Sequence, residues 1–167
     1  TEEEGRLSCR AERLRGCVIE LPFPSVGATE NTMIAACNAE GETQIRNAAC
    51  EPEILDLQNF LCSMGARISG AGSRTIIISG FSPREHVGHR VMPDRIVAAT
   101  GLCAAAATGG TGEMKGACPG DLLPVLEALS ASGCELRLKD QNITVKAPAG
   151  LRACGPVIRS EEHTSEL

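Results

Sequence analysis

The segment from Leu21 to Asn31 joins a short apolar run to a helix through a turn of serine, glycine and threonine. Such a turn presents backbone N–H groups where a helix begins, at the positive end of the helix dipole. Ser25 and Thr29 add hydroxyl groups, and Gly27 allows a close approach to the backbone. The segment therefore predicts a site for a phosphate or a sugar hydroxyl. The same residues also fit a second interpretation, in which Ser25 or Thr29 only caps a helix that begins near Glu30.

An internal repeat organises most of the chain. Residues 17–80 match residues 85–147 at a constant offset of 68, and only the last hairpin drifts by one residue. The matched positions include the glycines that end predicted helices, Gly41 with Gly109 and Gly65 with Gly133. Each copy is expected to run strand, helix, strand, helix, strand, strand, and neither copy encloses a core by itself. The chain therefore belongs to the α/β class and contains a duplicated supersecondary unit.

The spacing of apolar residues predicts the elements of each unit. In the first unit we expect helices over 30–40 and 51–64, and strands over 17–21, 43–48, 67–69 and 75–79. In the second unit we expect helices over 93–108 and 119–132, and strands over 89–92, 111–117, 135–138 and 143–147. The helix over 93–108 is so rich in alanine that it is expected to be buried around most of its circumference. A strand over 6–11 is expected to pair with 17–21 across a turn at Gly16.

Composition and charge limit the function classes. The 167 residues include three Phe and no Trp or Tyr, so aliphatic side chains and alanine must fill the core. The net charge of −5 comes from the two ends, since residues 2–4 contribute −3 and residues 159–167 contribute −2. The sequence contains no basic stripe of the kind that indicates nucleic-acid binding. It also contains no apolar run that approaches the roughly 18 residues of a membrane span.

Cysteine and histidine residues predict neither disulfides nor a metal site. The nine cysteines occur singly, without a signal peptide and without a Cys-x-x-Cys pair, so we expect reduced thiols in a cytosolic protein. His86 and His89 lie three residues apart in a polar linker, with no further ligand at a familiar spacing. We therefore interpret both as solvated linker histidines.

Both ends of the chain indicate a fragment of a larger reading frame. The chain begins without methionine, and residues 159–167 read like the translation of a sequencing adapter, so they are left out of the fold prediction.

Seven motifs follow one another in a fixed order: Pro24-Ser-Val-Gly-Ala-Thr-Glu-Asn31, Ala39-Glu-Gly41, Asn47-Ala-Ala49, Glu51-Pro-Glu-Ile54, Met64-Gly-Ala66, Gly70-Ala-Gly72 and Pro93-Asp-Arg-Ile96. Together they resemble the UDP-N-acetylglucosamine enolpyruvyl transferases, also called UDP-N-acetylglucosamine 1-carboxyvinyltransferases, over residues 5 to about 147. The resemblance implies an inverse α/β barrel of six βαβαββ units, arranged as two lobes of three around a cleft. Two of the six units are expected here. Residues 1–80 would end one lobe, residues 81–92 would form the interlobe crossover, and residues 93–158 would begin the second lobe.

The resemblance also implies an activity. Family members transfer the enolpyruvyl group of phosphoenolpyruvate to the 3′-hydroxyl of UDP-N-acetylglucosamine, the first committed step of peptidoglycan precursor synthesis, and they need no cofactor. A cytoplasmic transferase of cell wall biogenesis would follow, with roles in cell shape and division. Its partners would be its two small substrates and the remaining four units of its own chain. The family's catalytic residues lie outside this fragment, so none of the nine cysteines is expected to be catalytic and the fragment alone is predicted to be inactive.

Site residues carried over from the family fall into two groups. Those expected to touch the UDP-sugar are Phe23, Pro24, Ser25, Val26 and Gly27. Those expected near the cleft are Glu51, Glu53, Asp94 and Arg95, where a carboxylate could pair with Arg95. Helix capping or a surface salt bridge explains these last four equally well.

Some positions depart from the family pattern. A basic residue is usual where Cys50 stands, and a Glu and a Gly are usual where Val97 and Ala99 stand. Two alternatives therefore stay open: the sister enzyme enolpyruvylshikimate-phosphate synthase, and a non-catalytic paralogue that binds a nucleotide sugar. The Ser25-Val-Gly-Ala-Thr29 string argues against the sister enzyme, because that string accompanies the nucleotide sugar.

Overall fold

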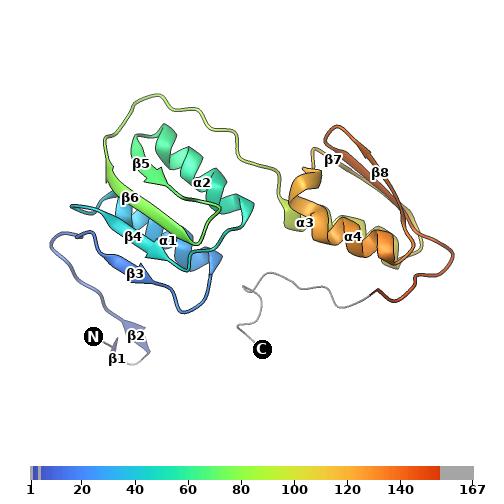
Figure 1. Cartoon of the computed structure of the whole chain (residues 1–167), viewed down its shortest axis with the longest axis horizontal. Helices are drawn as coiled ribbons and strands as arrows, with labels where there is room; N and C mark the ends of the chain where they lie inside the picture. The colour runs from blue at the N-terminus through green and yellow to red at the C-terminus, as the bar shows by residue number, and fades with distance from the viewer. Residues whose placement is uncertain (1, 4, 155–167) are drawn as a thin grey trace. The chain divides into compact units, whose positions relative to one another are not determined.

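The computed structural model describes residues 2–3 and 5–154, so the prediction for residues 159–167 lies outside the described residues. Within the described part, the chain forms two compact units that adjoin in sequence between Val91 and Met92 (Figure 1). The assignment of 1–80 and 93–158 to two lobes, with 81–92 between them, stays a prediction.

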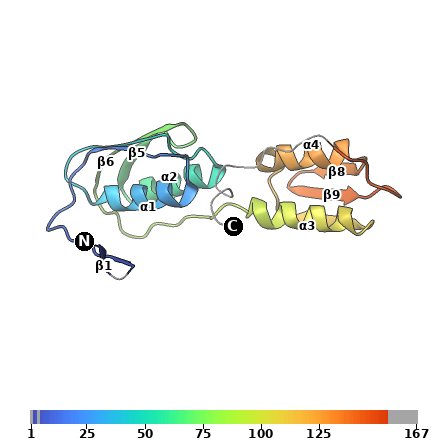
Figure 2. The ribbon, with the colours of Figure 1, turned by 90° about the horizontal axis from the view of Figure 1, so that it is seen from below.

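The first unit is a sheet with two helices on one face (Figure 2). The strand order is β3-β4-β6-β5, with β3 (Val18–Glu20) parallel to β4 (Thr43–Arg46) and the other pairs antiparallel. The remaining elements are α1 (Val26–Cys37), α2 (Pro52–Ser63), β5 (Ala66–Ser69) and β6 (Thr75–Phe81). The core lies between helices and sheet, where Met33, Ile45, Ile54, Ile76 and Ile78 are fully buried.

The second unit repeats this plan with three strands. The antiparallel order is β7-β9-β8, formed by β7 (Thr111–Lys115), β8 (Glu135–Lys139) and β9 (Asn142–Lys146). The helical elements are α3 (Arg95–Ala107), a 3-10 turn (Pro119–Leu122) and α4 (Leu123–Ala131). Leu102, Leu122, Ile143 and Val145 fill its core. The expectation that neither copy encloses a core by itself is therefore wrong, because in each unit the helices pack on one face of the sheet and bury a separate apolar cluster.

The predicted repeat is confirmed in element order and in sheet order. The order α1, β4, α2, β5, β6 recurs as α3, β7, α4, β8, β9, and β4-β6-β5 corresponds to β7-β9-β8. The matched glycines also share a backbone conformation, with φ of 92° at Gly41 and 70° at Gly109, and of 110° at Gly65 and 93° at Gly133. Gly65, Gly109 and Gly133 directly follow the cap residues of their helices, where a left-handed conformation ends a helix and glycine adopts it without steric cost. Gly41 does not end α1 as predicted, because that helix stops at Cys37 with Asn38 as its cap.

The predicted pairing of residues 6–11 with 17–21 is wrong. In the described residues, β2 (Arg6–Leu7) pairs with β1 (Glu2–Glu3), and β3 pairs in parallel with β4. Backbone bonds explain the difference, because Gly16 N–H donates to the Glu40 carbonyl and Glu40 N–H donates to the Leu14 carbonyl. A Cβ at Gly16 would collide with the backbone of Glu42, so glycine permits this close approach.

The predicted strand over 89–92 is also wrong, and so is the interpretation of His89 as a solvated residue. Residues 82–92 form no strand, and the His89 side chain is only 16% exposed. Its Nε2 lies 3.2 Å from both carboxylate oxygens of Asp56 on α2. This contact holds His89 on the first unit, so the second sheet lacks the strand that β3 provides in the first. His86, by contrast, is exposed as expected.

Helix α3 is buried along one face only, contrary to the expectation. Ala98, Leu102 and Ala106 face the core of the second unit, whereas Ile96 and Val97 are 53% and 64% exposed. Small residues let α3 approach the sheet, since a Cβ at Gly112 would come within 2.7 Å of the Ala105 side chain. The described chain covers only the sheet side of this apolar helix.

Cys37 has a raised pKa, first because of burial and second because of the nearby Cys62 thiol. All nine cysteines lie within the described residues as free thiols. A raised thiol pKa means that the folded state resists deprotonation, so this contribution to stability is lost as pH rises through the folded-state value. We therefore expect alkylation of native Cys37 to be far slower than that of exposed Cys103, with the difference abolished in urea, as followed by mass spectrometry.

Candidate functional site

Ser25 caps α1, whose first residue, Val26, lies four residues before the predicted start at Glu30. Its backbone is extended (φ −85°, ψ 127°), and its Oγ accepts a hydrogen bond from Ala28 N–H at 3.2 Å. The capping interpretation is therefore confirmed for Ser25. The turn is nevertheless open, because Phe23 is 46% exposed and no atom would crowd a Cβ at Gly27. A ligand can reach this helix start.

Thr29 is not available to a ligand, and its assignment as an added donor is wrong. Its side chain is fully buried, its Oγ1 donates to the Ser25 carbonyl at 2.7 Å, and it accepts from Ala49 N–H at 3.1 Å. The hydroxyl thus ties the start of α1 to the segment that leads into α2. Sequence reasoning missed this role, although a threonine four residues after a helix cap is placed to bond that carbonyl.

Asn47 provides a second tie between the same two loops. Its Nδ2 donates to the Leu21 carbonyl at 3.0 Å, and its Oδ1 accepts from Arg74 Nη1 at 3.2 Å. Its backbone is left-handed (φ 54°), which asparagine tolerates and which ends β4 before the predicted residue 48. Sequence reasoning included Asn47 in a motif but assigned it no role.

The candidate site therefore lies at the carboxyl edge of the parallel pair β3 and β4. The loop after β3 carries Phe23 to Gly27, and the loop after β4 ends at Glu51, the cap residue of α2. Glu51 makes no side-chain capping bond, and Glu53 lies in the first turn of the helix. The carboxyl ends of adjacent parallel strands are a frequent location for ligands in α/β folds. The bonds of Asn47 and Thr29 join the two loops that carry these residues. Of the expected UDP-sugar residues, Val26 is buried in the core of the first unit.

Asp94 and Arg95 belong to the second unit, so the pairing of Arg95 with a carboxylate of the first unit stays a prediction. Asp94 caps α3, and its Oδ1 accepts from the N–H groups of Ile96 at 2.8 Å and Val97 at 3.1 Å. The capping interpretation is therefore confirmed for Asp94. Arg95 is half-buried as the first residue of the helix.

We expect Asp94→Ala to lower the stability of the second unit by about 1 kcal/mol, because two helix N–H groups lose their acceptor. Asp94→Asn should change stability by only a few tenths of a kcal/mol, since asparagine caps as well as aspartate. Hydrogen exchange of the α3 amides measures both effects. Equal losses in the two variants would contradict the capping role.

A hollow of about 670 Å³ lies at the other end of α1. It is lined by Cys37, Asn38, Ala39, Gly41, Glu42, Arg67, Ser79, Gly80, Phe81 and Pro83. The guanidinium of Arg67 already has a partner in this hollow, since its Nη2 donates to the Ser79 carbonyl at 2.7 Å. None of the predicted site residues lines this hollow.

The described residues contain neither a membrane-spanning helix nor a cluster of metal ligands. None of their helices combines the length and apolar character that a bilayer crossing requires. No three of their His, Cys, Asp or Glu side chains gather as metal ligands would.

Residues 2–160 match the family described as EPSP synthase (3-phosphoshikimate 1-carboxyvinyltransferase). The chain belongs to this family. Among solved structures it resembles the enolpyruvyl transferase NikO from Streptomyces tendae, with a TM-score of 0.69, 23% identity and coverage of 85% of this chain and 37% of that one. It also resembles the EPSP synthase from Acinetobacter baumannii, with a TM-score of 0.59, 23% identity and coverage of 80% and 32%. The expected fold class is confirmed: the chain is a partial inverse α/β barrel of the enolpyruvyl transferase type.

Curated relatives within this family are more similar in sequence. UDP-N-acetylglucosamine 1-carboxyvinyltransferase 2 of Caldanaerobacter subterraneus subsp. tengcongensis is 51% identical over 144 residues, 86% of this chain and 34% of that protein. UDP-N-acetylglucosamine 1-carboxyvinyltransferase 1 of Symbiobacterium thermophilum is 52% identical over 84% of this chain and 32% of its own length. The UDP-N-acetylglucosamine 1-carboxyvinyltransferase of Nocardia farcinica is 49% identical over 90% of this chain and 35% of its own length. The chain thus spans about a third of the length of the curated relatives it matches.

Proposed function

We propose that this chain is part of a transferase that moves the enolpyruvyl group of phosphoenolpyruvate to the 3′-hydroxyl of UDP-N-acetylglucosamine. One observation carries the proposal: the chain is about half identical to proteins named for that reaction over most of its length. Such an enzyme acts in peptidoglycan precursor synthesis, and it would support cell shape and division from the cytoplasm.

In this proposal the open turn after β3 receives the UDP portion of the sugar nucleotide. Backbone N–H groups at the start of α1 and the positive end of its dipole favour a diphosphate. The exposed ring of Phe23 and the Ser25 hydroxyl lie beside that helix start. Glu51 and Glu53, at the start of α2, and Asp94 and Arg95, from the second unit, would line the cleft near the substrates.

The rest of the reaction requires residues beyond this chain. Addition and elimination of the enolpyruvyl group need an acid, a base and cations for the phosphates. The remaining barrel units would supply these groups and would cover apolar helix surface such as Ile96 and Val97, which are exposed here. The chain by itself is therefore expected to release no phosphate.

Two alternatives compete with this proposal. EPSP synthase activity is consistent with the family match, but the structural likeness to such an enzyme comes with only 23% identity. A non-catalytic paralogue is consistent with Cys50, Val97 and Ala99, which replace residues usual in the family.

A chimeric enzyme separates the three possibilities. Residues 5–147 of this chain replace the matched third of the Caldanaerobacter enzyme, and phosphate release from phosphoenolpyruvate is measured with each acceptor. We expect release that depends on UDP-N-acetylglucosamine. Release that depends instead on shikimate 3-phosphate would favour the sister enzyme.

The matched control is a chimera with the same third taken from the Symbiobacterium enzyme, which is similarly related to this chain. If the control chimera turns over and the test chimera folds but releases no phosphate, the paralogue interpretation replaces our proposal.

Ser25→Asp tests the anion site without removing the helix cap. Aspartate caps a helix as well as serine, so we expect stability to change by less than about 0.5 kcal/mol. Its carboxylate would oppose the diphosphate, so the Kd for UDP-N-acetylglucosamine in the chimera should rise at least about tenfold, or 1.4 kcal/mol. Calorimetric titration measures the affinity. An unchanged Kd would remove Ser25 from the site.

A further inference from the structure

The segment after β6 folds back along α2 as a strap, which we define as residues 82–89. At the carboxyl end of α2, Ser82 N–H donates to the Gly65 carbonyl at 3.0 Å and Arg84 N–H donates to the Met64 carbonyl at 2.9 Å. At its far end the strap reaches Asp56, in the first half of the helix, through His89. The strap therefore follows α2 from its carboxyl end toward its amino end.

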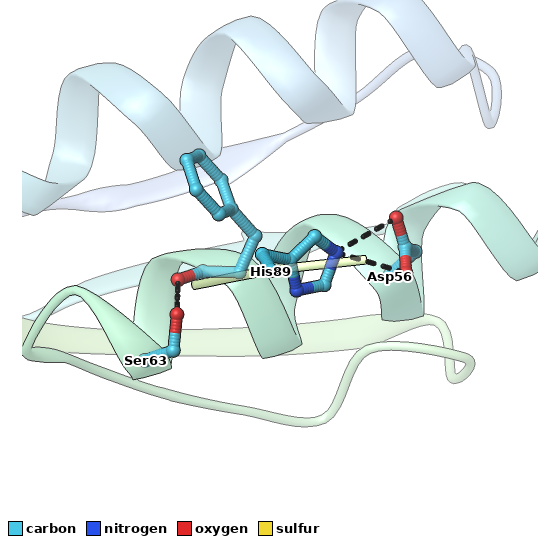
Figure 3. A network of polar contacts seen from close by, with 4 residues as sticks. Asp56, Ser63 and His89 are labelled. Atoms are coloured by element: carbon cyan, nitrogen blue, oxygen red, sulfur yellow. Dashed lines mark hydrogen bonds and ion pairs between the residues drawn. The ribbon is translucent and has the colours of Figure 1, made fainter. Parts of the chain in front are cut away.

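At the far contact, His89 meets the carboxylate of Asp56 (Figure 3). This contact is partly shielded from water. The side chains of His89 and Asp56 are 16% and 23% exposed, and Nε2 is equidistant, at 3.2 Å, from the two carboxylate oxygens. The His89 ring also lies 5.3 Å from the ring of Phe60, which stands one helical turn after Asp56. A shielded bond to a carboxylate is stronger than an exposed surface pair.

The contact at His89 shortens the chain that remains unanchored before α3. Asp94, which caps α3, follows His89 by five residues and Arg84 by ten. At full extension these segments reach about 17 Å and 35 Å respectively. Loss of the His89 contact would therefore double the length of free linker in front of Asp94 and Arg95.

We propose that His89 is a positioning residue, which latches the strap onto Asp56 and Phe60 of α2 and so restricts the linker that carries Asp94 and Arg95. It touches no substrate and acts through the strap. The functional consequence rests on the proposed function, because Asp94 and Arg95 matter there as cleft residues. The latch itself is a property of this chain, and it can be tested without substrate.

Limited trypsin digestion of the 167-residue chain reads the latch directly, because Arg84 and Arg90 are exposed cleavage sites within and beside the strap. Cleavage of a segment that opens and closes rapidly follows the population of its open form. We expect His89→Ala to speed cleavage after Arg90 roughly tenfold, as for loss of one charge-assisted hydrogen bond. Mass spectrometry of the products gives the rate at each arginine.

Four further variants make the test specific. His89→Gln keeps an N–H donor and should recover most of the protection, which a purely space-filling role for the ring does not predict. Asp56→Asn should speed cleavage, and the double variant Asp56→Asn/His89→Ala should be no faster than His89→Ala alone. His86→Asn, at the exposed histidine of the same strap, is the matched control and should leave the rate unchanged.

Several results would overturn the latch. These are equal cleavage rates in the wild type and His89→Ala, acceleration by His86→Asn, or fully additive effects of the Asp56 and His89 variants. Far-UV circular dichroism confirms that each variant is folded, and if His89→Ala is not, the comparison of Asp56→Asn with His86→Asn decides. In the active chimera, His89→Ala should lower kcat more than it raises KM for UDP-N-acetylglucosamine. An inactive chimera with a protected strap would reject the proposed function and leave the latch in place.

Discussion

Replacing Thr29 with valine should lower the free energy of unfolding by about 2–3 kcal/mol, because it leaves a buried N–H group without an acceptor. The hydroxyl is fully buried, donates to the Ser25 carbonyl and accepts from Ala49 N–H. Valine has nearly the same shape, so the loss isolates the two hydrogen bonds from packing. With no Trp or Tyr in the chain, urea unfolding is best followed by far-UV circular dichroism.

Thr29→Ser is the matched control, since it keeps the hydroxyl and removes one methyl group, a loss of about 1 kcal/mol. In the active chimera, Thr29→Val should also raise the Kd for UDP-N-acetylglucosamine, because Thr29 holds the loop of Ser25 against the loop of Glu51. If valine and serine variants were equally stable, the hydroxyl would not be the element that joins the two loops.

Local sequence patterns predicted most of the repeated unit correctly. Apolar spacing and helix-ending glycines such as Gly65 and Gly133 report on the few residues around them, so α2, α4 and the two hairpins were expected where they occur. Two strands were mispredicted because their partners are distant in sequence. The course of residues 14–17 depends on Glu40, and that of His89 on Asp56, 33 residues away.

In the candidate site too, local sequence patterns gave more of the structure than contacts between residues distant in sequence could. The turn composition predicted a helix start with Ser25 or Thr29 as its cap, but it placed the first helical residue near Glu30 and not at Val26. The role of Thr29 could not, because its second partner, Ala49, lies 20 residues away and the two meet only through the pairing of β3 with β4. The expected pairing of Glu51 or Glu53 with Arg95 depends on how the two units close in the whole protein.

Gly65→Ala should lower the free energy of unfolding of the first unit by at least about 3 kcal/mol. This is more than the cost of about 1–2 kcal/mol for placing an alanine in the left-handed conformation. Gly65 ends α2 with φ 110°, and a Cβ there would overlap the Ser82 carbonyl oxygen of the strap. The backbone must move to accommodate it, and the bond from Ser82 N–H to the Gly65 carbonyl lies in the same place.

The repeat offers the matched control for this substitution. Gly133 occupies the equivalent position in the second unit with φ 93°, but its Cβ would meet the Arg152 guanidinium at 3.2 Å, a flexible group that can move aside. Gly133→Ala should therefore cost only the conformational penalty of about 1–2 kcal/mol. Hydrogen exchange resolved by peptide assigns each loss to its unit. Because Ser82 is the first residue of the strap, Gly65→Ala should also speed tryptic cleavage after Arg84, whereas Gly133→Ala should not. If the two substitutions had equal effects, helix termination and not contact with the strap would explain why glycine is required at position 65.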